Sequence, residues 1–122
     1  MPRSRTSKPE HGRFDDREVE SLAPGVTRVA ITARRGRLAR LRFEAGAGLP
    51  EHAHPQEEIV LVERGRLLFK LGETEYILGP GEFLLLPSGT AHEVRALGRR
   101  EARAVITQFG VGVLARRGKG VL

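Results

Sequence analysis

Apolar and polar residues alternate along much of the chain, in short stretches that end at turn residues. In the stretch from 37 to 44, Ala39, Leu41 and Phe43 alternate with charged side chains. A period of two is typical of a half-buried β-strand, because successive side chains point to opposite faces. Similar apolar stretches occur at residues 26–33, 57–63, 66–71, 74–78, 82–86, 92–97 and 101–109.

Turn signals separate these stretches about every seven to ten residues, among them Gly36, Gly65, Gly72 and Gly98. No long segment with a helical period lies between them. This spacing indicates an all-β sandwich or barrel. Residues 14–22 could form a short helix that ends before Gly25, and an extra strand is the alternative.

The length of 122 residues indicates one small domain. We expect a flexible basic arm over residues 1–12, a single β-barrel domain over 13–114 and a flexible basic tail over 115–122. The chain has no cysteine, which excludes a disulfide framework, a zinc-thiolate site and an iron–sulfur cluster.

The formal charge of +6 lies mostly near the ends, with +2 in residues 1–12 and +3 in residues 115–122. Segments of this composition are more often disordered than functional, so we do not expect nucleic acid as a partner. No stretch reaches the roughly 20 apolar residues of a membrane span, and the first residues lack the apolar part of a secretory signal. We therefore expect no membrane association and a cytoplasmic location.

The stretch from 52 to 58 carries candidate chemistry. His52, His54 and Glu58 have even numbers, so an extended chain would project all three to one side, together with Gln56. Pro55 favours an extended conformation at the residue before it. A single strand would then present two imidazoles and a carboxylate inward.

His92 is the remaining histidine within the predicted strands and follows the turn at 87–91. A strand that begins there and lies beside the first would complete a site of three imidazoles and one carboxylate, which suits iron, manganese, nickel, copper or zinc. Glu58 could ligate the metal, act as a base beside it or pair with an arginine. The alternative for the histidines is ordinary hydrogen-bonded side chains in the core or at the surface.

Two groups of residues have a fixed spacing. The first is a glycine, two histidines, a glutamate and a closing glycine: Gly46, His52, His54, Glu58 and Gly65. The second is a glycine, a proline, a glycine and a histidine: Gly81, Pro87, Gly89 and His92. This spacing resembles the two signature motifs of the cupin superfamily over roughly residues 36–110. The closing asparagine of the second motif falls on Ala96, so that position departs from the pattern.

The resemblance implies an all-β, double-stranded β-helix (jelly-roll) barrel of the small single-domain type, with a metal inside it. It implies that the ligands are His52, His54, Glu58 and His92. The cofactor would be one divalent transition metal ion, with iron or manganese favoured and nickel, zinc or copper as alternatives. The asparagine usually lies away from the metal, so Ala96 should not prevent metal binding.

The resemblance leaves two functions open. The first is a mononuclear metal-dependent enzyme of dioxygenase-like type that acts on a small oxygenated organic substrate, with Glu58 as catalytic base; isomerase and decarboxylase chemistry also occur among similar proteins. The second is a non-catalytic module that binds a sugar-like small molecule or regulates a partner. Candidate pocket residues are Gln56, Tyr76 and Phe83. We also expect a homodimer, because short barrels leave sheet edges that need covering.

Overall fold

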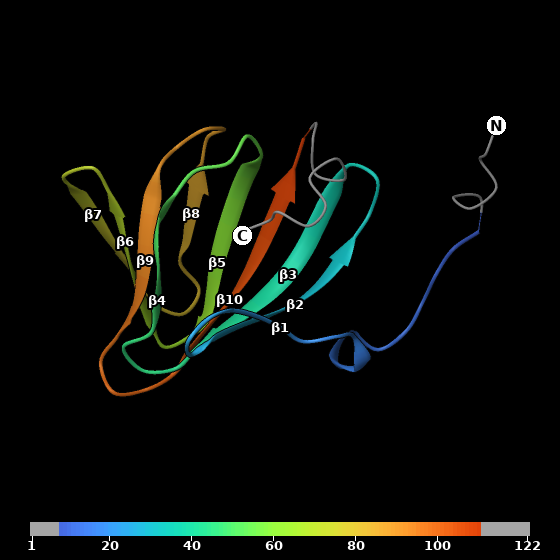
Figure 1. The fold of residues 1–122 in the computed structure, drawn as a ribbon, viewed down its shortest axis with the longest axis horizontal. Coiled ribbons are helices and arrows are strands. Elements are labelled where there is room, and N and C mark those ends of the chain that lie inside the picture. Colours follow the sequence, from blue (N-terminus) through green and yellow to red (C-terminus); the bar gives the residue numbers. More distant parts are fainter. Residues whose placement is uncertain (1–7, 111–122) are drawn as a thin grey trace.

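The computed structural model describes residues 8–110, which form an almost entirely β structure (Figure 1). One turn of 3-10 helix, η2 (Phe14–Asp16), precedes the strands. The strands are β1 (Glu20–Ala23), β2 (Val26–Thr32), β3 (Gly36–Phe43), β4 (Gly48–His52), β5 (Glu57–Arg64), β6 (Arg66–Leu71), β7 (Thr74–Leu78), β8 (Phe83–Leu86), β9 (His92–Leu97) and β10 (Ala102–Phe109). No helix in residues 8–110 has the length and apolar character to cross a membrane.

The strands form two antiparallel sheets. Sheet A has the order β1-β2-β3-β10-β5-β8, and sheet B has the order β4-β9-β6-β7. From β3 onward the chain passes repeatedly between the sheets, with β4, β6, β7 and β9 in one and β5, β8 and β10 in the other. This alternation is that of a jelly-roll barrel, which confirms the predicted fold class.

The segment before the barrel differs from the helix considered for residues 14–22. Only η2 is helical, and β1 pairs with β2 as an extra strand. Glu20 lies opposite Arg28 in this pairing and forms an ion pair with it, which favours the extended form. Gly25 makes the tight connection between the two strands with a φ of 79°, a conformation that favours glycine.

The barrel interior holds the apolar side chains that the alternating pattern predicts. The buried hydrophobic residues are Val26, Ala39, Leu41, Phe43, Leu49, Val60, Val62, Leu67, Phe69, Leu78, Leu86, Val94, Ala96, Ala102, Ala104 and Ile106. Ala96 lies near the end of β9 that is remote from His92, and it is 1% exposed in this core. Its small side chain therefore serves as packing.

Gly65 allows a close approach of two parts of the chain at the turn between β5 and β6. Its φ is 73°, and a Cβ there would lie 2.4 Å from the carbonyl oxygen of Glu101. Any side chain would push β10 away from this turn. The closing glycine of the first motif is therefore required by packing.

The register of sheet A places two contrasting rows of side chains on opposite faces. Five aligned residues form what we call the inner row: Thr32, Arg37, Gln108, Glu58 and Leu86. Each has a chain neighbour in the outer row: Ile31, Leu38, Thr107, Ile59 and Leu85. The inner row is mostly polar and faces the barrel interior, whereas the outer row is mostly apolar and faces away from it.

Candidate metal centre

Three histidines come together where the two sheets face each other. His52 ends β4 and lies directly opposite His92 at the start of β9, with ring centroids 4.4 Å apart. His54 comes from the loop that follows β4. Ligand nitrogens of all three lie within 4.8 Å of one another, so the histidines are positioned for a metal ion.

The expectation that one continuous strand carries His52, His54 and Glu58 is wrong. β4 ends at His52 in sheet B, and β5 begins at Glu57 in sheet A. Residues 53–56 carry the chain across from one sheet to the other. The side chains still converge because the two sheets face the same interior, while the expected pairing of the His52 strand with the His92 strand is confirmed.

Each imidazole ring is oriented by a backbone carbonyl close to it in the sequence. Nδ1 of His52 lies 2.8 Å from the carbonyl oxygen of Pro50, and Nδ1 of His92 lies 2.8 Å from that of Thr90. Nδ1 of His54 lies 3.3 Å from the carbonyl oxygen of Gln56. A carbonyl only accepts, so Nδ1 donates the proton, and Nε2 of the neutral ring keeps its lone pair.

The three Nε2 atoms are buried and have no hydrogen-bond partner. Buried polar atoms are nearly always satisfied, so three unsatisfied lone pairs in one place require an explanation. Rings held by a carbonyl on one nitrogen, with the other nitrogen free, are the usual arrangement of metal-binding histidines. The donor atoms therefore fit a bound ion better than ordinary core histidines.

Glu58 lies beside the histidines and is completely buried. Its Oε1 is 2.8 Å from Nε2 of His54, a contact that is an ion pair when His54 is protonated, and its Oε2 has no partner. Ligand atoms at right angles around an ion lie about 3 Å apart when each is roughly 2.1 Å from it. The 2.8 Å separation is close to this spacing, and a buried carboxylate needs a cation.

The surroundings shift the pKa values of two of these histidines in opposite directions. Burial lowers the pKa of His92, and the nearby His52 and His54 lower it further. Burial also lowers the pKa of His54, but the contact with Glu58 and its charge outweigh this effect, so the net pKa is raised. The lowered pKa favours the neutral form of His92 that a metal requires, whereas the raised pKa of His54 means that a metal competes with a proton for its Nε2.

Gln108 of β10 supports Glu58 and was not identified from the sequence. It donates from Nε2 to Oε1 of Glu58 at 3.2 Å and accepts a hydrogen bond of 3.4 Å from Arg37. Arginine has no acceptor, so it fixes the amide with its oxygen toward Arg37 and its NH₂ toward Glu58. A signal was present, because Gln108 continues the inward alternation of Ala104 and Ile106 with a polar residue.

The three candidate pocket residues lie in different environments. Gln56 is 7% exposed, and its carbonyl orients His54. Tyr76 lies opposite Phe69 on the edge strand β7 of sheet B and is 40% exposed. Phe83 lies opposite Leu61 on the outer face of sheet A and is 65% exposed, so it points away from the histidines. The buried aromatic near the centre is instead Phe69, whose ring centroid is 6.2 Å from that of His92.

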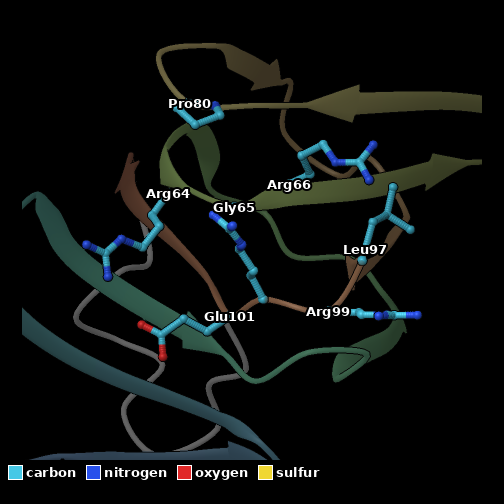
Figure 2. Close-up of a pocket in the computed structure, with 9 residues that line it drawn as sticks. Arg64, Gly65, Arg66, Pro80, Leu97, Arg99 and Glu101 are labelled. Atoms are coloured by element: carbon cyan, nitrogen blue, oxygen red, sulfur yellow. The ribbon is translucent and has the colours of Figure 1, made fainter.

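A pocket of about 650 Å³ lies at the end of β5 and β9 that is remote from the histidines (Figure 2). Its lining includes four arginines, Arg64, Arg66, Arg99 and Arg100, which form no ion pair within residues 8–110. Figure 2 shows that the guanidinium groups of Arg64 and Arg66 point to different sides of the pocket. Because β5 and β9 run from the histidines to this end, the pocket is separate from the metal centre.

Fold and site together define a small jelly-roll barrel with histidines positioned for a metal inside it. The chain belongs to the cupin family, since the Cupin domain pattern matches residues 39–107. A relative, Protein SchB of Streptomyces halstedii, is 33% identical over 110 residues, which cover 85% of this chain and 78% of that protein.

Solved structures support the same fold. An RmlC-like cupin from Shewanella frigidimarina superposes with a TM-score of 0.73 at 19% identity, covering 83% of this chain and 91% of that one. The polyketide cyclase RemF from Streptomyces resistomycificus superposes with a TM-score of 0.72 at 19% identity, covering 84% and 80%. Similarity at this level of identity concerns the fold alone.

Proposed function

We propose that this cupin is a mononuclear metal-dependent enzyme that acts on a small oxygenated organic molecule. The ligands would be His52, His54 and His92, with Glu58 as the fourth. The observation that carries this proposal is the set of three buried imidazole Nε2 atoms, which have no hydrogen-bond partner and face one another. A mixed nitrogen and oxygen donor set favours iron or manganese, with nickel, zinc and copper as alternatives.

A divalent ion held here would supply a Lewis acid for substrate oxygens and, in the case of iron, redox capacity for dioxygenase-like chemistry. The protein supplies a proton acceptor in Glu58, whose Oε2 is free. A hydrogen bond of 3.2 Å from Gln108 to its Oε1 holds this carboxylate in place. The proposed site would thus bind substrate oxygens at the ion and hold a base, Glu58, beside them.

Proton-transfer chemistry without dioxygen is the second candidate. It is favoured by the free oxygen of Glu58, since a carboxylate that is not fully engaged can move a proton of the substrate. The fold shared with the polyketide cyclase RemF is consistent with this chemistry but does not assign it. Oxygen consumption in the presence of a turned-over substrate separates the two candidates.

The first test is elemental analysis of untagged protein purified without chelator or nickel resin. We expect about one equivalent of metal per chain, and none in the double variant His52→Ala/His92→Ala. The absence of metal from both proteins, even after anaerobic loading with iron or manganese, would overturn the proposal. Metal that nitric oxide or azide cannot reach would point to a non-catalytic module that binds a sugar-like ligand.

We also propose that the protein is a homodimer that pairs through the outer face of sheet A. Six exposed apolar residues lie on this face: Ile31, Leu38, Ile59, Leu61, Phe83 and Leu85. They extend from β2 to β8 across five strands, roughly 19 Å at the usual strand spacing, and contiguous patches of this kind mark interfaces.

A second copy of the chain is the occupant that fits this face. Arg40 lies between the apolar positions, and its charge is matched by Glu63 at 3.1 Å. Two such faces can therefore meet without opposing like charges. The cytoplasmic location expected from the sequence stays a prediction.

A further inference from the structure

The inner row leads from the candidate metal centre to a polar pocket that opens to solvent at the side of the barrel formed by β1, β2 and β3. From Glu58 the row passes through Gln108 to Arg37, with hydrogen bonds of 3.2 and 3.4 Å. Arg37 lines a cavity of about 220 Å³ on the inner face of sheet A, formed by Arg17, Glu18, Glu20, Arg28, Ala30, Thr32 and Arg37. One glutamine therefore separates this cavity from a proposed metal ligand.

Arg28 is an unusual residue for the inside of a barrel. It is only 6% exposed, and its Nε donates to Oε1 of Glu20 at 2.9 Å. Its Nη1 is buried and has no hydrogen-bond partner. A charged group in this state costs free energy unless an acceptor reaches it, so Nη1 of Arg28 lacks an acceptor that would offset its burial.

Arg37 shows the same excess of positive charge. Its burial lowers the pKa of its guanidinium, the nearby charge of Arg28 lowers it further, and Glu20 offsets only part of this effect. The cavity lining contains three arginines and two glutamates, a net charge of +1. This balance matches one singly charged anionic group better than a doubly charged phosphate.

We propose that Arg28 and Arg37 bind the carboxylate of a small organic acid in this cavity. A carboxylate accepts two hydrogen bonds from a guanidinium in a planar arrangement, and it would satisfy Nη1 of Arg28. The hydrogen-bonded chain of Arg37, Gln108 and Glu58 would connect the bound carboxylate with the candidate metal centre. The carboxylate site depends only on residues between 17 and 37, whereas the assignment of the acid as substrate rests on the proposed function.

The experiment uses butyrate as the probe and butyramide as its uncharged counterpart. Both are titrated into the full chain in low-chloride buffer, and the arginine Nε–H signals are followed by ¹H–¹⁵N NMR. Each titration is repeated on metal-loaded and chelator-treated protein. The variants are Arg37→Gln, with Arg37→Lys as the version that keeps the charge, and Arg99→Gln as the matched control in the other arginine pocket.

We expect butyrate to shift the Arg28 and Arg37 signals saturably in both metal states and butyramide to shift neither. Arg37→Gln should weaken butyrate binding about tenfold or more, since it removes a charged hydrogen-bond partner. Arg37→Lys should retain part of the affinity, and Arg99→Gln should retain all of it. Because chelator-treated protein is included, butyrate binding there would uphold the carboxylate site even if metal binding failed.

Three results would overturn the inference. One is equal binding of butyrate and butyramide, which would mean that the charge is not recognised. Another is unchanged butyrate affinity in folded Arg37→Gln protein. The third is loss of binding in Arg99→Gln but not in Arg37→Gln, which would place the anion in the surface pocket of Figure 2.

Discussion

The inner and outer rows of sheet A differ by one residue in every strand, yet their chemistry is opposite. Inside the barrel, Glu58 and Gln108 are almost completely buried, whereas their chain neighbours Ile59 and Thr107 face outward. Soluble barrels usually place apolar residues inside and polar residues outside. The reversal occurs at the end of sheet A that faces the histidines of the other sheet, while the interior near Phe43 and Val62 is apolar.

The comparison indicates that each row needs a different binding partner. A buried polar row is unfavourable unless every group in it is satisfied, so the inner row indicates an ion and a ligand inside the barrel. An exposed apolar row is unfavourable in water, so the outer row indicates a covering surface. Three variants test these two statements, and a fourth tests the ion pair beside the proposed carboxylate site.

The largest expected effect follows removal of a histidine of the cluster beside Glu58 of the inner row. His92→Ala should lose stoichiometric metal while keeping its β-sheet circular dichroism, because it removes one of the three converging nitrogens. Metal content by mass spectrometry is the measurement, and His11→Ala is the control. Retention of a full equivalent of metal by folded His92→Ala would refute the ligand assignment.

The outer row is tested by Phe83→Lys. Light scattering should give twice the 13.4 kDa of one chain for the parent protein and 13.4 kDa for the variant. Two lysines brought together in an apolar contact would cost several kcal/mol. Ile77→Lys is the control, since Ile77 is 54% exposed but lies in sheet B. A monomeric parent protein would show that something else covers the outer row.

The support that Gln108 gives to Glu58 predicts a smaller effect. Gln108→Leu leaves both Glu58 and Arg37 without this partner, so the metal-free protein should lose about 1–3 kcal/mol of unfolding free energy. Urea denaturation measures this loss. Thr107→Val, the matched change in the outer row, should be close to neutral, and equal losses in both variants would remove the distinction between the rows.

The smallest effect concerns the pH dependence of the ion pair between Glu20 and Arg28. The hydrogen bond from Arg28 lowers the pKa of Glu20 below its usual 4.5, so the pair stabilises the folded protein above that pH and loses this contribution as pH falls through the lower folded value. Glu20→Gln should cost below about 1 kcal/mol at pH 7, because the carboxylate is half exposed. The difference from the parent protein should shrink in urea unfolding as the pH is lowered below 4.5, and a constant difference would contradict the prediction.

The sequence carried the fold and part of the site for identifiable reasons. Alternation predicted the inward side chains of β3, and the motif spacing brought His52, His54 and His92 together because the turns between them have fixed lengths. The even spacing of His52, His54 and Glu58 correctly predicted that their side chains come together. The assumed reason, a single continuous strand, was wrong, because the chain changes sheets after His52. The hydrogen bond between Arg37 and Gln108 joins residues that are 71 positions apart. It depends on how β3 and β10 pair, which local sequence patterns do not contain.

Phe83 shows a different limit. In a strand as short as β8, alternation alone does not tell which of two apolar sets faces inward. The pairing with β5 places Leu84 and Leu86 inside, opposite Val60 and Glu58. An aromatic expected near the pocket therefore lies on the outer face.

The hydrogen bonds that orient the histidines have a consequence for how such a protein can diverge. Each ring is held by the carbonyl of a residue two positions away, Pro50, Gln56 or Thr90, and backbone carbonyls persist through side-chain substitution. The orientation of the proposed metal ligands therefore does not depend on the residues of β1 to β3 that would select a ligand. Substitutions in β1 to β3 can change which ligand binds while the three histidines keep their orientation.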